Sequence, residues 1–168
     1  PETREVVMLE QRALPSEVNY HRYRTVDEIA DSIRDMVVRG APAIGIAAAY
    51  GLVLLAGKEK GDAPTFLMAN GVAGKHLNAT RPTAVNLAWA IARMSRKAAD
   101  VAALDPDARY AAMLEEAENI HREDVASCRA MGVLGAAAVP AGAPILTPCH
   151  AAPPPPAGSS PPAPSIRC

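Results

Sequence analysis

Two arginines in this chain stand just before a proline and a helix-like segment. Arg39 is followed by Gly40, Ala41 and a proline, and Arg81 is followed by a proline and a threonine. A helix N-terminus offers free N–H groups and a positive dipole end, and a guanidinium adds a planar cation that binds two oxygens at once. The two segments are therefore candidates for one phosphate site. The alternative for each segment is a plain helix junction with a solvated arginine.

Cysteine and histidine residues supply the other candidates for chemistry. Cys149 follows residues 143–147, which read like a buried strand, and a thiol in that position is often reactive. The alternative is an inert thiol. Cys128 is expected in the core, and residues 121–124 are expected on a solvated helix face. The four histidines have no metal-binding spacing and no nucleotide-binding glycine motif occurs, so we expect neither a metal nor a cofactor.

The first secondary-structure elements of the chain precede Arg39 and have to bring it to the proposed site. Short apolar runs at 6–9 and 18–23 predict two strands joined by a turn. Thr25 and Glu28 have the spacing of a capping box, which predicts the start of a helix. An apolar stripe at helical spacing continues that helix, and Gly40 is expected to end it. The stripe consists of Ile29, Ile33, Met36 and Val37.

The later elements are all expected to be helices. Residues 42–56 are apolar on all sides, which predicts a buried helix rather than a membrane span, because the run is shorter than the roughly 20 residues that a span needs. A second helix is expected over 64–76. The segment 80–83 has the pattern of a helix start and predicts a third helix up to residue 99. Residues 105–106 begin the last long helix.

Composition limits the class of protein. The chain has 168 residues, 49% of them hydrophobic, which is enough for one domain with a sizeable core. Its 17 basic and 18 acidic residues leave no basic excess for nucleic acid or a membrane surface. Three widely spaced cysteines and a charged N-terminal segment favour a reduced, cytoplasmic protein.

The character of the chain changes near residue 140. Ten prolines occur between Pro140 and Cys168, and residues 153–156 are all proline. Proline excludes a helix or a central strand here, so we expect extended or disordered chain. The sequence thus predicts a β-plus-helical domain over 1–139 and a separate segment over 140–168.

Two long segments resemble those of a known enzyme family. The segments 39–51 and 80–87 are similar to the best-marked motifs of methylthioribose-1-phosphate isomerases, and 9–15 resembles the start of those enzymes. The resemblance extends over roughly residues 5 to 147. The superfamily also includes ribose-1,5-bisphosphate isomerases and the regulatory subunits of translation initiation factor 2B.

The resemblance implies a fold, an activity and site residues. It implies an α+β chain: a small N-terminal antiparallel β-sheet, a mainly helical domain, and the start of a Rossmann-like α/β domain. The implied reaction is the cofactor-free isomerisation of 5-methylthioribose 1-phosphate to 5-methylthioribulose 1-phosphate in methionine salvage, by a homodimer. Arg39, Gly40, Ala41 and Arg81 match substrate-binding positions, and Cys149 falls where the family has its catalytic cysteine.

The chain departs from the family pattern around that cysteine. The family has Thr-His-Cys-Asn-Ala/Thr-Gly, whereas this chain has Thr-Pro-Cys-His-Ala-Ala at 147–152. No aspartate here matches the family's catalytic one. We therefore expect a truncated chain, with a shifted reading frame after about residue 147 as one explanation and with negligible isomerase activity alone. The alternative function is a non-catalytic regulatory module like the initiation factor 2B subunits.

Overall fold

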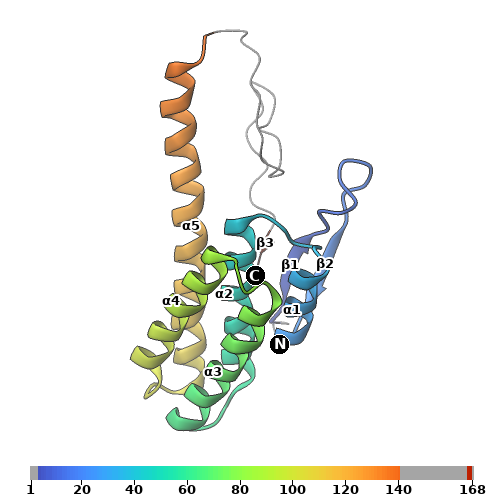
Figure 1. Cartoon of the computed structure of the whole chain (residues 1–168). Coiled ribbons are helices and arrows are strands. Elements are labelled where there is room, and N and C mark those ends of the chain that lie inside the picture. Colours follow the sequence, from blue (N-terminus) through green and yellow to red (C-terminus); the bar gives the residue numbers. More distant parts are fainter. Residues whose placement is uncertain (1–3, 141–165, 168) are drawn as a thin grey trace.

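The computed structural model describes residues 4–140 and 166–167. This part of the chain forms a small antiparallel sheet beside five helices, four of which make an antiparallel bundle (Figure 1). The α+β fold class expected from the sequence is confirmed. The expected domain boundary near residue 140 stays a prediction, because residues 141–165 lie outside the described part.

The sheet packs against the helices through one face of its central strand. β1 (Val6–Leu9) and β2 (Tyr20–Tyr23) pair antiparallel, with Val6 opposite Tyr23. Val6 and Met8 are fully buried and alternate with partly exposed residues, as the period of two in a strand requires. The two-residue strand β3 (Ile166–Arg167) pairs with β1 and gives the order β2-β1-β3. Both strands predicted from the sequence are present.

Helix α1 (Val26–Arg34) begins as predicted and ends earlier than predicted. Thr25 accepts a hydrogen bond from the backbone of Glu28, and the Glu28 side chain accepts from the backbone of Thr25, so the capping box is complete. Gly40 does not end this helix. The chain instead turns at Met36, whose φ of 60° lies in the left-handed region, and the next residues run back along the end of β1.

Helix α2 (Ala41–Lys58) forms the centre of the molecule. It contacts all four other helices, and its residues are buried on every side from Ile44 to Leu54. By length and composition α2 could also cross a membrane, but 67% of its apolar window is buried within the fold, as in the core helix of a globular protein. The predicted buried helix is confirmed.

Helices α3 (Ala63–Thr80) and α4 (Val85–Val101) pack side by side against α2. The predicted helix start at 80–83 is wrong. Thr80 is the last residue of α3, and its hydroxyl donates to the carbonyl of Leu77 at 2.7 Å, which satisfies an acceptor at the helix end. Residues 81–84 form the connection, so α4 begins only at Val85.

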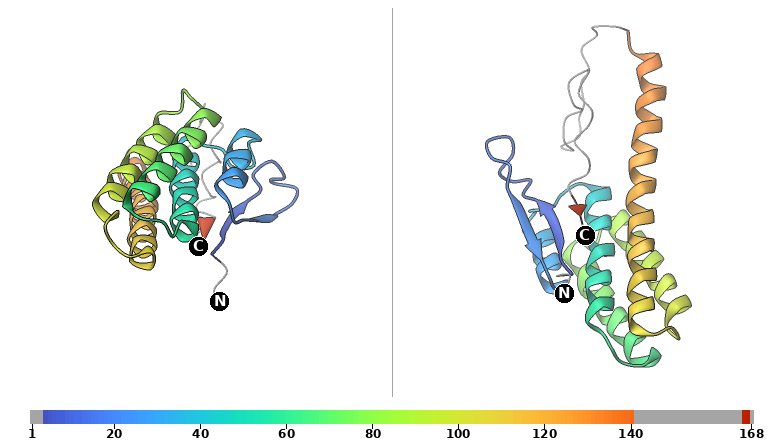
Figure 2. Two further views of the ribbon diagram at one scale, coloured as in Figure 1. Left: turned by 90° about the horizontal axis from the view of Figure 1, so that it is seen from below. Right: turned by 180° about the vertical axis from the view of Figure 1, so that it is seen from behind.

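Helix α5 (Pro106–Ala138) is much longer than its neighbours. Its 33 residues span about 50 Å at 1.5 Å per residue. The first half packs on α2 and α4 through buried residues such as Met113 and Ile120, whereas the second half projects past the end of the bundle (Figure 2). Cys128 lies on the projecting half and is exposed, so its predicted place in the core is wrong. Its position matches the helical period, but no element among residues 4–140 reaches far enough along α5 to cover it.

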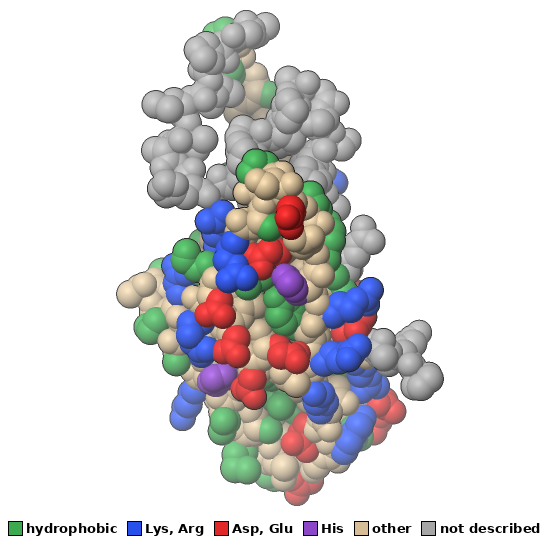
Figure 3. Space-filling model, turned by 90° about the vertical axis from the view of Figure 1, so that its right-hand side faces the viewer, with side chains coloured by type: hydrophobic (Ala, Val, Ile, Leu, Met, Phe, Trp, Pro, Cys, Tyr) green, Lys and Arg blue, Asp and Glu red, His purple; other side chains and the backbone are tan. Residues whose placement is uncertain are grey.

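The face that carries the hairpin and α1 is mixed in charge. Lysine and arginine side chains lie among aspartate and glutamate side chains across the middle of this face (Figure 3). One source of this mixture is Glu5, which pairs with Arg22 and Arg24 across the hairpin. This face offers no extended basic patch for nucleic acid.

Candidate phosphate-binding site

The N-terminus of α2 has no side-chain cap. Gly40 occupies the N-cap position with φ at 101°, a conformation that glycine adopts without strain, and it has no side chain to accept from the first turn. The second helical residue, Pro42, has no N–H, and the first turn contains no acidic residue. The N–H groups of Ala41 and Ala43 therefore have no acceptor within the helix. Arg39 lies exposed immediately before this helix end.

The N-terminus of α4 is uncapped in the same way. Ala84 is its N-cap residue, no side chain accepts from the first turn, and that turn has no acidic residue. Arg81, three residues earlier, is exposed, and its guanidinium makes no hydrogen bond or ion pair within the described residues, although its carbonyl accepts from the backbone of Ala84. By contrast, each of the other helices in the described chain begins with a side-chain cap: Thr25, Asp62 and Asp105.

A close approach of α2 to α4 brings these two uncapped ends together. A Cβ atom added at Gly45 would lie 2.8 Å from the carbonyl oxygen of Asn86 and 3.4 Å from the Cβ of Ala90. Only glycine fits such a contact without moving a backbone. Gly45 is one turn inside α2 and Asn86 is in the first turn of α4, so the contact sets the spacing between the two helix starts.

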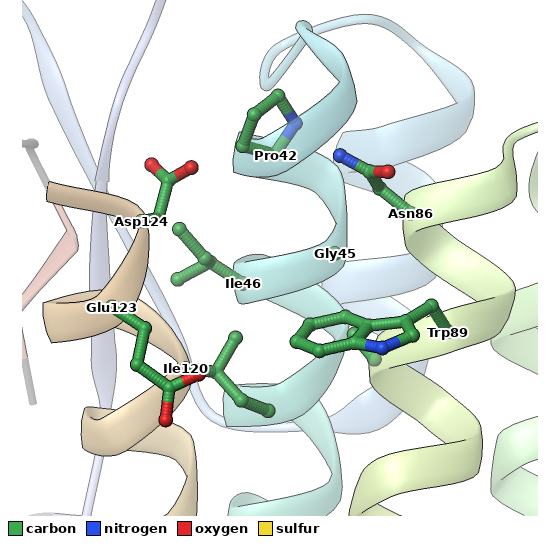
Figure 4. A pocket seen from close by; sticks show the side chains of 9 residues that line it. Pro42, Gly45, Ile46, Asn86, Trp89, Ile120, Glu123 and Asp124 are labelled. Atoms are coloured by element: carbon green, nitrogen blue, oxygen red, sulfur yellow. The ribbon is translucent and has the colours of Figure 1, made fainter. Parts of the chain in front are cut away.

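A hollow of about 120 Å³ lies below these helix ends, between α2, α4 and α5 (Figure 4). Its walls are apolar except for Asn86 near the top and two carboxylates from α5. Its lining comprises Pro42, Gly45, Ile46, Asn86, Trp89, Ala90, Ile120, Glu123 and Asp124. Binding pockets for whole small molecules usually measure roughly 300 to 1,000 Å³. This hollow is therefore suited to one group of a ligand rather than to all of it.

One of the two carboxylates is neutralised by an arginine from α4. Arg93 donates to both oxygens of Glu123, one of them at 2.8 Å, and to Glu116 at 2.6 Å. These bonds hold the pKa of Glu123 below its usual range. The Arg93 guanidinium also lies 5.4 Å from the ring centre of Trp89. The network fixes α4 to α5 along the wall of the hollow and leaves Glu123 charged but paired.

The other carboxylate, Asp124, is half-buried and points toward Pro42 (Figure 4). Burial raises its pKa, and the nearby His121 partly offsets the increase. His121 is itself half-buried, with its Nδ1 atom 3.3 Å from the hydroxyl of Tyr50, and burial lowers its pKa. The expectation of a solvated face over 121–124 is therefore wrong for His121 and Asp124, because α5 packs this side against α2.

The structure places three of the predicted site residues at one helix start and the fourth near the other. Arg39, Gly40 and Ala41 are consecutive at the start of α2, and Arg81 follows the last residue of α3 in the connection to α4. Cys149 lies outside the described residues. Sequence reasoning missed Asn86, which lies within a segment singled out for its resemblance, and Trp89, the one tryptophan of the chain, which comes three residues later.

A family model and curated proteins match this chain over most of its length. Residues 37–153 match the model of the initiation factor 2 subunit family. An Anaeromyxobacter protein named methylthioribose-1-phosphate isomerase is 49% identical over 151 residues, which cover 89% of this chain and 41% of that protein. An Alcanivorax borkumensis protein of the same name is 48% identical over 85% of this chain and 40% of its own length. The chain thus spans about two fifths of these relatives.

Two solved structures share the fold. The 5-methylthioribose 1-phosphate isomerase of Pyrococcus horikoshii OT3 aligns with a TM-score of 0.76 and 38% identity, over 83% of this chain and 40% of that one. The delta subunit of the translation initiation factor eIF-2B from A. fulgidus aligns with a TM-score of 0.65 and 35% identity, over 71% of this chain and 35% of that one.

Proposed function

Because this chain belongs to the initiation factor 2 subunit family, we propose that it is the phosphate-binding part of a methylthioribose-1-phosphate isomerase. The substrate of that enzyme is a sugar phosphate, 5-methylthioribose 1-phosphate. The observation that carries the proposal is the pair of uncapped helix N-termini, each with an exposed arginine close before it, at one end of the bundle. The names and the fold of the relatives support this assignment.

The two helix starts supply what a phosphate dianion needs. The N–H groups of Ala41 and Ala43 and the guanidinium of Arg39 would bind oxygens at the start of α2, and Arg81 would add a second cation from the start of α4. A hydrogen bond to a charged group contributes about 1.5–3 kcal/mol. The positive ends of two helix dipoles add to the same field. Phosphate binding is thus the step to which the described residues contribute.

The isomerisation itself needs groups that act at the sugar. The phosphate on C1 prevents the ring from opening as a free hemiacetal does, so an acid must protonate the ring oxygen as it leaves. A hydrogen must then move from C2 to C1, either through an enediol or as hydride. We propose Cys149 for this work, on the basis of its matching position. An aspartate partner would come from sequence that the longer relatives have beyond the aligned part.

The single tryptophan makes phosphate binding measurable. Trp89 lines the hollow and is about half exposed, so its fluorescence should report a ligand bound there. Titration with 5-methylthioribose 1-phosphate should give a saturable change. Arg39→Gln and Arg81→Gln should each weaken binding by about tenfold, the loss of one charge-assisted hydrogen bond.

The matched control is Arg34→Gln, which removes an exposed arginine that pairs with Asp31 on α1. This variant should bind like the original chain. The proposal fails if the original chain gives no saturable change, or if the Arg39 and Arg81 variants bind as tightly as it does.

The likeness to the initiation factor delta subunit favours a second candidate, a non-catalytic regulatory module. Such a protein needs the fold but neither a catalytic cysteine nor a sugar phosphate. Copurification of an initiation factor with the chain, together with no binding of the sugar phosphate, would favour the regulator. If another reading frame of the encoding DNA after about residue 147 gave a Cys-Asn-Ala/Thr-Gly segment and a later aspartate, that finding would favour the enzyme.

A further inference from the structure

The segment 9–15 has no role in the phosphate site described above. It nevertheless runs beside the segment that carries Arg39. The backbone N–H of Gln11 donates to the carbonyl of Val37 at 2.9 Å, and the guanidinium of Arg39 donates to the carbonyl of Gln11 at 3.2 Å. The main chain at Gln11 therefore makes two hydrogen bonds to the segment that carries Arg39. One goes to the backbone of Val37 and the other comes from the side chain of Arg39.

An ion pair between the buried Glu10 and the half-exposed Arg12 flanks Gln11 on both sides. Glu10 is only 6% exposed, and its carboxylate accepts from Arg12 through two parallel bonds, Nε to Oε1 at 2.8 Å and Nη2 to Oε2 at 2.7 Å. The backbone N–H of Arg12 adds a bond to the same carboxylate at 3.0 Å, and His21 Nε2 lies 3.3 Å from it. Such a bidentate pair fixes geometry as well as charge.

The same arginine also reaches the turn before Arg39. Arg12 Nη1 donates to the carbonyl of Asp35 at 3.3 Å, next to Met36, whose left-handed backbone redirects the chain. Val37 and Val38 then insert into the core with exposures of 7% and 2%. Residues 35–39 are thus held by the core on one side and by residues 10–12 on the other.

We infer that Glu10 and Arg12 are positioning residues for Arg39. Their ion pair shapes residues 10–12 so that the carbonyl of Gln11 holds the Arg39 guanidinium at the start of α2. Neither side chain touches the phosphate, so their effect on a ligand passes through Arg39. This inference rests on the proposed phosphate-binding role of Arg39.

Glu10→Gln tests the inference, because it keeps the shape of the side chain and removes the charge that orders Arg12. Binding of 5-methylthioribose 1-phosphate and of inorganic phosphate would be measured by Trp89 fluorescence in the 168-residue chain. The affinity should fall by about tenfold, comparable with Arg39→Gln itself. Glu5→Gln is the matched control, since Glu5 pairs with Arg22 and Arg24 on the same hairpin and, within the described residues, makes no hydrogen bond or ion pair with residues 35–39. The control should bind like the original chain.

A double variant separates positioning from a general loss of structure. In an Arg39→Gln background, Glu10→Gln should cause no further loss of affinity, because the residue through which it acts is gone. An equal tenfold loss in both backgrounds would overturn the inference. Arg12→Lys, which keeps the charge but not the fork, should behave like Glu10→Gln and provides the same test if Glu10→Gln does not fold.

The outcomes also separate this inference from the proposed function. If the original chain does not bind the sugar phosphate, the proposed function fails. If it binds, and Arg39→Gln weakens binding while Glu10→Gln and Arg12→Lys do not, the positioning inference alone fails.

Discussion

The two ends of the helical bundle differ in whether side chains cap the helix N-termini. At the end where α3 and α5 begin, Asp62 and Asp105 cap the helices, and the buried Arg109 donates to the carbonyl of Gly61 at 2.7 Å and lies over the ring of Phe66. At the end where α2 and α4 begin, neither helix has a side-chain cap, and exposed arginines lie nearby.

The difference separates stability from binding. A cap satisfies N–H groups permanently and stabilises a helix by about 1 kcal/mol. A helix end without a cap gives up that stabilisation and keeps its N–H groups available to an anion. We call the end where α3 and α5 begin the closed end and the end where α2 and α4 begin the open end. The closed end has helix N–H groups bound by side-chain caps, and the open end is where we propose that the ligand binds. Functional sites commonly give up stability in this way.

The largest expected effect comes from forcing the two open helix ends apart. Gly45→Ala places a Cβ 2.8 Å from the Asn86 carbonyl, and this overlap should lower the free energy of unfolding by about 2–3 kcal/mol. Binding of the sugar phosphate should weaken in the same variant. Urea denaturation and Trp89 fluorescence measure the two effects.

Gly71→Ala is the control, since a Cβ at Gly71 meets nothing within 4 Å. It lies inside α3, so alanine should raise the free energy of unfolding by about 0.5–1 kcal/mol. Equal free energies of unfolding for Gly45→Ala and Gly71→Ala would mean that the close contact of α2 with α4 at Gly45 does not contribute to the stability of the fold.

Removal of the buried charge next to the open end should cost somewhat less. At pH 7, Glu10→Gln should lower the free energy of unfolding by about 1–2 kcal/mol, because the buried side chain loses its charge-assisted hydrogen bonds from Arg12, which is itself half exposed and can be hydrated. The side-chain hydrogen bond from Arg12 lowers the pKa of Glu10 from 4.5 to about 2. The stabilisation is therefore complete above pH 4.5 and is lost as the pH falls toward 2. Denaturation of the original chain and of the Glu10→Gln variant at several pH values should show their free energies of unfolding converging in acid. A difference that stays constant with pH would contradict the assignment of this stabilisation to the Glu10 carboxylate.

Closing the open end should exchange binding for stability. Ala84→Asp places a cap at the start of α4, where the extended backbone of Ala84 suits one, and should raise the free energy of unfolding by about 1 kcal/mol. The same carboxylate should repel the phosphate and weaken its binding by about tenfold. Thermal denaturation and fluorescence titration of one preparation measure both.

Opening the closed end should give the reverse pattern. Asp105→Ala removes the cap of α5, which accepts from Asp107 and Ala108, and should lower the free energy of unfolding by about 1 kcal/mol. Its affinity for the sugar phosphate should not change. Weaker binding in this variant would show that the two ends are coupled.

The smallest expected effect concerns Asp124 in the hollow. Burial raises its pKa, so its contribution to stability is present at low pH and is lost as the pH rises through the raised value. After allowance for solvent screening, Asp124→Asn should raise the free energy of unfolding at pH 7 by a few tenths of a kcal/mol. The gain should disappear below pH 4, and an unchanged gain there would exclude ionisation of Asp124 as its cause.

Local sequence patterns predicted where most elements begin. The capping box at Thr25, the apolar run of α2 and the Asp105 cap of α5 depend on neighbours within four residues, so they could be recognised from the sequence. The end of α1 was missed because the pairing of Gln11 with Val37 redirects the chain, and that contact joins residues 26 positions apart.

The candidate site could be predicted only in part, for the same reason. Arg39 and Arg81 stood out because each comes before a proline. The positions of Asn86 and Asp124 in the hollow depend on the contact of α2 with α4 and on the rotation of α5, which no local pattern encodes. The expected helix start at 80–83 failed because Pro82 lies in the connection instead of the first turn.

The two halves of the long helix α5 differ in how much of their surface is packed against the rest of the protein. Met113 and Ala117 are fully buried against α2, whereas Met131 and Leu134 are mostly exposed beyond the bundle. A helical stretch of about a dozen residues without packing is only marginally stable in water. Amide hydrogen exchange along α5 should therefore show a gradient, with slow exchange near Met113 and exchange close to that of an unstructured peptide near Leu134. One continuous helix would then contain a permanent segment and a segment that opens and closes many times before the rest of the protein unfolds once.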